Sequence, residues 1–287
     1  MNSAVTSAAI LKYFYQEPDL FALKQAMEST GIGMLTGHVN VRRYLPIFGC
    51  REVATFFRHP VAQVASHYEH HVRHLGYSGS FEQFIEENRF RNMQSRTVSA
   101  LLPALLGFIG LTERYNESIE LFNSFYQRDF ASLSLNASPS RKQDDPRFPK
   151  MQSMDKALFR RVTELNSDDM RVYHAAELIF DERLKALRKG KRYGFGIVHG
   201  LNSTQVSGLA FGADDDAAEV EIRINGKPVA VVRAAEPRLQ LAESRLPREG
   251  FVGFTYRFRE APKIGDKVEC VLAATGQVLR GANVIEN

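Results

Sequence analysis

The sequence predicts an α/β domain, with a parallel sheet and flanking helices, followed by a small antiparallel β-sandwich. Short apolar runs alternate with longer amphipathic stretches up to about residue 188, as expected for strands alternating with helices. Beyond that point glycine and short alternating runs predominate. A length of 287 residues also fits one large domain and one small one. We therefore predict an α/β domain over residues 1–189 and a β-sandwich accessory domain over residues 190–287.

Two strand-helix units stand out in the first part. Residues 52–57 (EVATFF) form a β-branched and aromatic run, and residues 61–75 (VAQVASHYEHHVRHL) have helical spacing. A second run at 105–110 (LLGFIG) precedes an amphipathic stretch at 118–125. Strands alternating with helices indicate a parallel sheet covered on both faces. Ligands in such sheets bind beyond the carboxyl ends of the strands, so we expect chemistry just after these two strands.

The next two segments are connections. Residues 138–150 (SPSRKQDDPRFPK) contain three prolines and mixed charge, which predicts a long loop, either a flap or a plain connection. Residues 183–194 (RLKALRKGKRYG) indicate a basic helix end with Gly190 as the stop, and the domain boundary lies here. We interpret these basic residues as a solvated helix terminus; a nucleic-acid patch is the alternative.

The C-terminal part has the pattern of antiparallel strands. Residues 220–234 (VEIRINGKPVAVVRA) alternate apolar and polar positions around Asn225-Gly226, a strong hairpin signal because both turn positions require positive φ. Further strands are expected at 251–258 and 268–272. Together they predict a sandwich of about 95 residues, a common size for such modules. It is either an accessory module for large glycans or a structural cover for the incomplete α/β sheet.

Composition excludes several classes of protein. Lys and Arg outnumber Asp and Glu by 37 to 33, and the excess is dispersed, so a dedicated nucleic-acid binder is not expected. The two cysteines, Cys50 and Cys270, form no disulfide framework or zinc motif, which favours a reducing, cytoplasmic location. The longest apolar run, residues 98–111, is interrupted by Pro103 and Gly107, so we expect it in the core and expect no membrane segment. The N-terminus, MNSAVTSAAILKYF, has no charged n-region or long apolar core, so no export signal is expected.

The segment most indicative of chemistry is TFFRHPVAQVASHY at residues 55–68. Arg58 leaves the strand, Pro60 opens the helix, and Ser66 lies about two turns into it. An arginine fork and a hydroxyl near a helix start form a phosphate site. The same pattern also arises from helix capping or an ion pair, and both interpretations stay open.

Five further motifs lie along the chain, one before the arginine segment and four after it. They are Gly37-His38, 91–96 (RNMQSR), 108–122 (FIGLTERYNESIELF), 135–141 (LNASPSR) and 168–180 (DDMRVYHAAELIF). Together with the arginine segment they resemble the carbohydrate sulfotransferases that use 3′-phosphoadenosine 5′-phosphosulfate (PAPS), a branch that includes heparan sulfate 2-O-sulfotransferase. The resemblance covers roughly residues 2–185. It implies a P-loop-like sheet, PAPS as co-substrate, no metal, and transfer of a sulfuryl group to a saccharide or glycan hydroxyl.

The resemblance also implies roles for individual residues. His38 is the expected base that accepts the acceptor proton, although a buried or capping histidine is the alternative. The residues implied in nucleotide binding are Asn2, Ser3, Arg58, Ser66, Asn136, Ser138 and Arg141. Those implied in acceptor binding are Asn92, Gln94 and Arg96, for which a surface loop is the simpler explanation.

One departure from the family pattern concerns the phosphate loop. The family opens with a strand and a PKTAGTSL-like loop, whereas this chain begins MNSAVTSAAIL, so Asn2-Ser3 match only the end of that loop. Without the loop lysine we expect poor sulfate transfer, slower by more than about a hundredfold. The sheet is also expected to have an unpaired edge. Truncation and decay both explain this, so the alternative function is a non-catalytic nucleotide- or glycan-binding protein on a degenerate sulfotransferase fold.

Two other groups of residues have simpler explanations. His67, His70, His71 and His74 repeat at helical spacing, but no cysteine or carboxylate has a motif linking it to them, so we expect no metal site. Tyr173 and Phe180 share one helix face and are expected in the core. A nucleotide kinase is disfavoured because the G-x-x-x-x-G-K-[ST] motif is absent.

Overall fold

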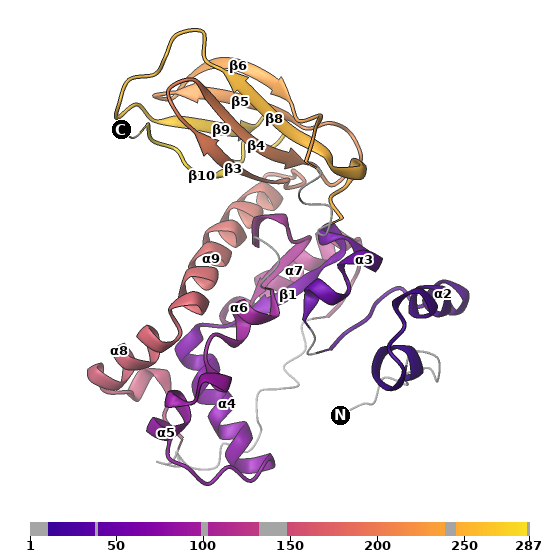
Figure 1. The fold of residues 1–287 in the computed structure, drawn as a ribbon, viewed down its shortest axis with the longest axis vertical. Helices are drawn as coiled ribbons and strands as arrows, with labels where there is room; N and C mark the ends of the chain where they lie inside the picture. The colour runs from indigo at the N-terminus through magenta and orange to yellow at the C-terminus, as the bar shows by residue number, and fades with distance from the viewer. Residues whose placement is uncertain (1–10, 38–39, 99–102, 132–147, 239–244, 286–287) are drawn as a thin grey trace.

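The computed structural model describes residues 11–37, 40–98, 103–131, 148–238 and 245–285. These form a mixed α/β protein with one small parallel sheet and separate antiparallel sheets (Figure 1). The α-helices and the parallel sheet lie before residue 189, and the antiparallel strands follow. The change from helical to strand structure falls between the end of α9 at Arg188 and the start of β3 at Phe195.

The parallel sheet consists, in the described residues, of β1 (Ala54–Phe57) and β2 (Phe108–Leu111), paired from Ala54 opposite Phe108 onward. Both predicted strands are confirmed, but each begins later than expected because the 3-10 segments η3 (Cys50–Glu52) and η5 (Pro103–Leu105) precede them. Every position of β2 is buried, whereas Phe56 of β1 is 39% exposed. Of the strands described, only β2 pairs with β1.

Amphipathic helices pack around this sheet. After β1 comes α4 (Pro60–His74), and after β2 comes α7 (Tyr115–Tyr126), which confirms both predicted strand-helix units. The long helix α9 (Ser167–Arg188) packs against β2 and α7 and buries Tyr173 and Phe180, as expected. The shorter segments are α5 (Phe81–Glu86), η4 (Asn88–Phe90), α6 (Met93–Thr97), η6 (Thr112–Arg114), η7 (Met151–Ser153) and α8 (Lys156–Leu165).

Two N-terminal helices, the π-helix η1 (Leu11–Gln16) and α2 (Leu20–Thr30), form an arm that lies apart from the parallel sheet in Figure 1. The next elements, η2 (Val41–Arg43) and α3 (Leu45–Phe48), lead back to the sheet, where Leu45 joins its buried core. The Asp19 carboxylate caps α2 by accepting bonds from two main-chain amides, and Gly31 ends the helix with a φ of 66°. A small apolar cluster joins Phe14, Leu23 and Met27 of the arm to Tyr44.

The C-terminal part contains two sheets around a shared apolar cluster that includes Val206, Ile222 and Phe254. One sheet has the order β10-β3-β4-β8-β7 and the other β6-β5-β9. Asn225 and Gly226 have φ of 50° and 79°, which confirms the predicted two-residue hairpin. The elements are β3 (Phe195–Leu201), β4 (Gln205–Phe211), β5 (Glu219–Ile224), β6 (Lys227–Arg233), β7 (Glu236–Pro237), η9 (Arg248–Gly250), β8 (Phe251–Arg257), β9 (Val268–Leu272) and β10 (Arg280–Gly281).

The β-sandwich packs directly on the α/β domain. Phe195, Phe211 and Val252 of the sandwich belong to the same buried cluster as Phe108 and Phe180. Figure 1 shows α9 running up to the base of the sandwich. Because the core is continuous across the boundary, the structure favours the role of a structural cover over that of a detached module.

Arg183 corrects one expectation. The basic end of α9 was expected to be solvated, but Arg183 is fully buried beneath the sandwich. Its guanidinium donates to the carbonyl oxygens of Ala104 at 3.3 Å and Gly107 at 3.5 Å. It also lies 4.7 Å from the ring of Tyr193 and 4.9 Å from that of Phe195. Carbonyl oxygens and aromatic faces thus take the place of solvent around this cation.

Candidate functional site

The structure describes five of the eleven residues assigned to the site from the sequence: Arg58, Ser66, Asn92, Gln94 and Arg96. The other six, Asn2, Ser3, His38, Asn136, Ser138 and Arg141, lie outside the described residues. The described residues come from the carboxyl end of β1, from α4 and from the start of α6. Of these residues, the structure brings Gln94 into contact with Arg58 at the carboxyl end of β1.

Arg58 follows β1 directly, and its main chain is held by a side chain from another element. The amide N–H of Arg58 donates to Oε1 of Gln94 at 2.8 Å, and Nε2 of Gln94 donates to the Arg58 carbonyl oxygen at 2.8 Å. One amide side chain thus pairs with both main-chain groups of one residue, as a neighbouring strand would. Sequence reasoning assigned Gln94 to the acceptor; in the structure both ends of its amide are bound to Arg58.

The Arg58 guanidinium has no hydrogen-bond or ion-pair partner among the described residues, and the same holds for the Ser66 hydroxyl. Both residues are half-buried. Pro60 occupies the first turn of α4, and His59 at the N-cap makes no side-chain capping bond. The capping and ion-pair alternatives for Arg58 therefore find no support in the described residues.

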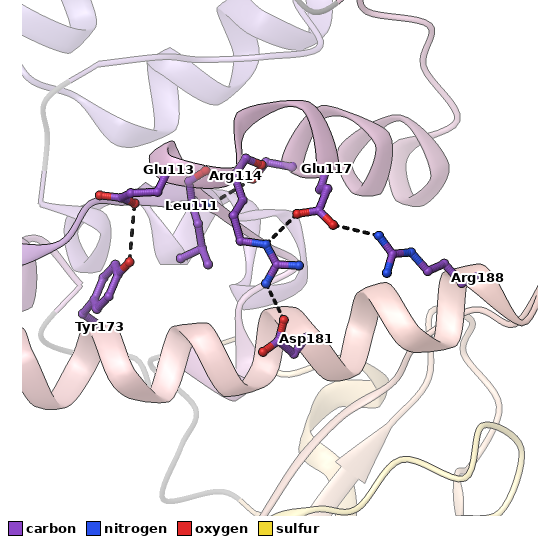
Figure 2. Close-up of polar contacts among 8 residues, drawn as sticks. Leu111, Glu113, Arg114, Glu117, Tyr173, Asp181 and Arg188 are labelled. Atoms are coloured by element: carbon purple, nitrogen blue, oxygen red, sulfur yellow. Dashed lines mark hydrogen bonds and ion pairs between the residues drawn. The ribbon is translucent and has the colours of Figure 1, made fainter.

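Glu113 holds the residue after Arg58. It lies in η6, directly after β2, and its Oε1 accepts a hydrogen bond from the His59 main-chain N–H at 2.8 Å. Its Oε2 accepts from the hydroxyl of Tyr173 at 3.4 Å, a contact that Figure 2 shows between η6 and α9. Burial raises the pKa of Tyr173, so the hydroxyl stays protonated and donates. Sequence reasoning gave Glu113 no role, although it noted the surrounding motif.

The neighbouring cation, Arg114, is occupied. Its Nε donates to Oε2 of Glu117 at 2.5 Å, and it also pairs with Asp181 on α9 (Figure 2). Oε1 of Glu117 pairs with Arg188 at 2.7 Å. Arg114 is the main cause of a lowered pKa at Glu117, which is therefore ionised at neutral pH. This network ties η6 and α7 to α9, so Arg114 is already paired within the described residues.

His59 adds a neutral group next to Arg58. Burial lowers its pKa below the ordinary value for histidine, against the opposing effects of Glu113 and Glu177. Its ring meets that of Tyr173 edge to face at 5.4 Å, and its Nδ1 is buried without a partner. The imidazole is therefore uncharged at neutral pH, and the positive charge at this end of β1 comes from Arg58.

Helices α6 and α9 cap one another, and this fixes two of the three residues predicted to bind the acceptor, Asn92 and Gln94. Oδ1 of Asn92 accepts from the main-chain amides of Asp168 and Asp169 at 3.1 and 3.2 Å. The fully buried Asp169 carboxylate accepts in turn from the amides of Gln94 at 3.1 Å and Ser95 at 2.7 Å. The side-chain oxygen of Asn92 is thus engaged within the protein.

Arg96 is different, because its side chain is exposed at the end of this segment. Among the described residues its guanidinium donates to the Asn88 carbonyl oxygen at 2.9 Å. Of the three residues predicted to contact the acceptor, Arg96 is therefore the most exposed.

Two of the histidines of α4, His67 and His71, contact each other. Nε2 of His67 and Nε2 of His71 lie 3.1 Å apart. Burial lowers the pKa of His67 to about 4, so it is neutral at pH 7. Within the described ranges no group of three or more metal-ligating side chains converges on one point.

No protein-family model, curated protein or solved structure matches this chain. Among the helices described, none combines the length and the apolar character that crossing a membrane requires. A function therefore has to be inferred from the geometry around Arg58 and from the resemblance carried by the motifs.

Proposed function

We propose that this chain is a sulfotransferase that moves a sulfuryl group from PAPS to a hydroxyl of a saccharide acceptor. The proposal rests on the contacts made by the main chain of Arg58 and of the residue after it. Its main chain is bound by Gln94, the following amide is bound by Glu113, and its guanidinium has no partner among the described residues. An arginine whose main chain is held at the carboxyl end of a parallel strand suits a phosphate group.

In this proposal Arg58 and Ser66 hold the 3′-phosphate of the nucleotide. The guanidinium supplies charge-assisted hydrogen bonds, and the hydroxyl of Ser66 adds a neutral donor from α4. The N-terminus of that helix begins at Pro60, two residues after Arg58. The positive end of the helix dipole therefore lies close to Arg58 in the chain. By the family resemblance, Asn2, Ser3, Asn136, Ser138 and Arg141 complete the nucleotide site.

The transfer itself follows from the resemblance. The acceptor hydroxyl oxygen forms a bond to sulfur while the bond from sulfur to the 5′-phosphate oxygen breaks. His38 takes the hydroxyl proton, and the products are a sulfate ester and adenosine 3′,5′-bisphosphate. As in phosphoryl transfer, most of the rate enhancement would come from positioning and charge stabilisation.

The acceptor contact is assigned to Arg96. Asn92 and Gln94 use their side-chain oxygens within the protein, whereas the Arg96 side chain is exposed. A guanidinium suits a saccharide that carries carboxylate or sulfate groups. We therefore propose an anionic glycan as the acceptor, with Asn92 and Gln94 supporting the segment that presents Arg96.

The proposal is tested by incubating the protein with ³⁵S-labelled PAPS and a panel of desulfated anionic and neutral saccharides. We expect transfer of label to an anionic saccharide and none to a neutral one, because the acceptor contact is assigned to a guanidinium. His38→Ala is the control that keeps nucleotide binding and abolishes transfer. Binding of PAPS with no transfer to any saccharide would identify a non-catalytic binding protein instead.

A further inference from the structure

We propose that Gln94 and Glu113 are positioning residues for Arg58, and that they fix the main-chain position from which its side chain reaches an anion. Both act on the main chain at the end of β1. The inference rests on the proposed function, because it names the residues that hold the arginine of the same phosphate site. Sequence reasoning assigned Gln94 to the acceptor and gave Glu113 no role.

Gln94 is itself held rigidly. The main-chain amides of Gln94 and Ser95 donate to the carboxylate of Asp169, which is fully buried at the start of α9. From this fixed position the Gln94 side chain reaches both the N–H and the C=O of Arg58 at 2.8 Å. Gln94, 36 residues further along the chain, therefore bonds the main chain of Arg58 directly after β1, as a neighbouring strand would.

Glu113 contacts the loop after β1 from η6, the turn that follows the neighbouring strand β2. It follows β2, and its two carboxylate oxygens have separate partners, the main-chain N–H of His59 and the Tyr173 hydroxyl. Tyr173 is 4% exposed and lies on α9, the helix that also anchors Gln94 through Asp169. A carboxylate near an anion site opposes the anion electrostatically, so the benefit of Glu113 lies in its hydrogen bond to the loop.

These contacts bind three consecutive main-chain groups, the N–H and C=O of Arg58 and the N–H of His59. The Arg58 side chain, in contrast, has no partner in the described residues. A fixed main chain limits the entropy lost on ligand binding to that of the Arg58 side chain itself. Gln94 and Glu113 each contact a residue of α9, Asp169 and Tyr173 respectively. This helix therefore holds both positioning residues in place.

The test compares the affinities for adenosine 3′,5′-bisphosphate and for 5′-AMP by calorimetry. Glu113→Ala and Gln94→Met should each weaken bisphosphate binding roughly tenfold and leave 5′-AMP binding unchanged, since a misplaced guanidinium loses the 3′-phosphate alone. Glu113→Gln should stay within about twofold of wild type, because its amide oxygen still accepts from His59. The matched control is Glu117→Ala, which removes a nearby carboxylate that does not contact the Arg58 loop.

Two further measurements separate positioning from a merely structural role. In an Arg58→Ala background, Glu113→Ala and Gln94→Met should change bisphosphate affinity by less than about twofold, because the residue they act through is gone. Amide exchange followed by NMR in the free protein should become faster at His59 in Glu113→Ala and at Arg58 in Gln94→Met. If a variant unfolds, Tyr173→Phe provides a milder loss of the Glu113 contact.

The outcomes distinguish the inference from the proposed function. Unchanged amide exchange at Arg58 and His59, or equal weakening of both nucleotides, would overturn the positioning role and leave the proposed function standing. A wild-type protein that binds 5′-AMP as tightly as the bisphosphate would overturn the proposed function, and the positioning role toward phosphate with it. Loss of affinity in Glu113→Gln equal to that in Glu113→Ala would show that charge, not the hydrogen bond, is what Glu113 supplies.

Discussion

Replacing Phe195 with alanine tests whether the β-sandwich and the parallel sheet form one folding unit. Phe195 opens β3 and is fully buried. Its ring stacks on Phe211 at 4.9 Å, meets Phe125 of α7 at 5.7 Å, and lies 4.9 Å from the guanidinium carbon of Arg183. The substitution therefore removes a ring that joins the two parts of the core.

The expected cost follows from cavity formation. A Phe to Ala change in a close-packed core costs about 3–5 kcal/mol. For 287 residues the entropy of unfolding is about 0.6 kcal/mol/K, so the melting temperature should fall by about 5–8 °C. The control is Val231→Ala on β6, where the side chain is 56% exposed and the expected change is within about 1 °C.

The assay is thermal unfolding followed by helical circular dichroism. Each α-helix in the described ranges precedes residue 189, so this signal reports the α/β domain and not the sandwich. We expect one cooperative transition that moves down in Phe195→Ala. A helical transition that stays at the wild-type temperature while the β signal melts earlier would refute a shared core.

The remaining predictions concern single groups. The pKa of His67 is lowered to about 4 by burial, so below about pH 6.5 the unfolded chain binds a proton that the folded protein does not, and stability falls. His67→Gln should therefore lose less melting temperature between pH 7 and 5 than wild type does. Gly226→Ala should cost about 1 kcal/mol because φ is 79°, whereas Gly33→Ala, in open space without positive φ, should cost little. Burial raises the pKa of Cys50 and Cys270 to about 12, so a thiol reagent at about pH 8 should label them only after unfolding.

Local pattern predicted much of the fold. The strands β1 and β2 are apolar runs followed by amphipathic helices, and the turn at Asn225-Gly226 requires residues that tolerate positive φ. These features depend on neighbours within a few residues, so one sequence is enough to find them. The strand starts were placed too early because the 3-10 turns before β1 and β2 also contain apolar residues.

The site was predicted only in part, because its supports come from distant segments. Arg58 and Ser66 were found from a spacing within one strand-helix unit. The contact of Gln94 with Arg58 and that of Glu113 with His59 span 36 and 54 residues, and no local pattern encodes them. The same holds for Arg183, whose basic surroundings suggest solvent until the sandwich covers it.

The central claim is that Arg58 binds the 3′-phosphate of the nucleotide. The most direct measurement is calorimetric titration of wild type and Arg58→Ala with adenosine 3′,5′-bisphosphate and with 5′-AMP. Arg171→Ala, which removes an exposed arginine of α9, controls for the change in net charge.

Loss of the charged contact should cost about 1.5–3 kcal/mol, which is a loss of roughly ten- to 150-fold in bisphosphate affinity. Binding of 5′-AMP should be unchanged in Arg58→Ala, and Arg171→Ala should match wild type for both ligands. Equal bisphosphate affinity in wild type and Arg58→Ala, or equal affinity of wild type for the two nucleotides, would contradict the claim.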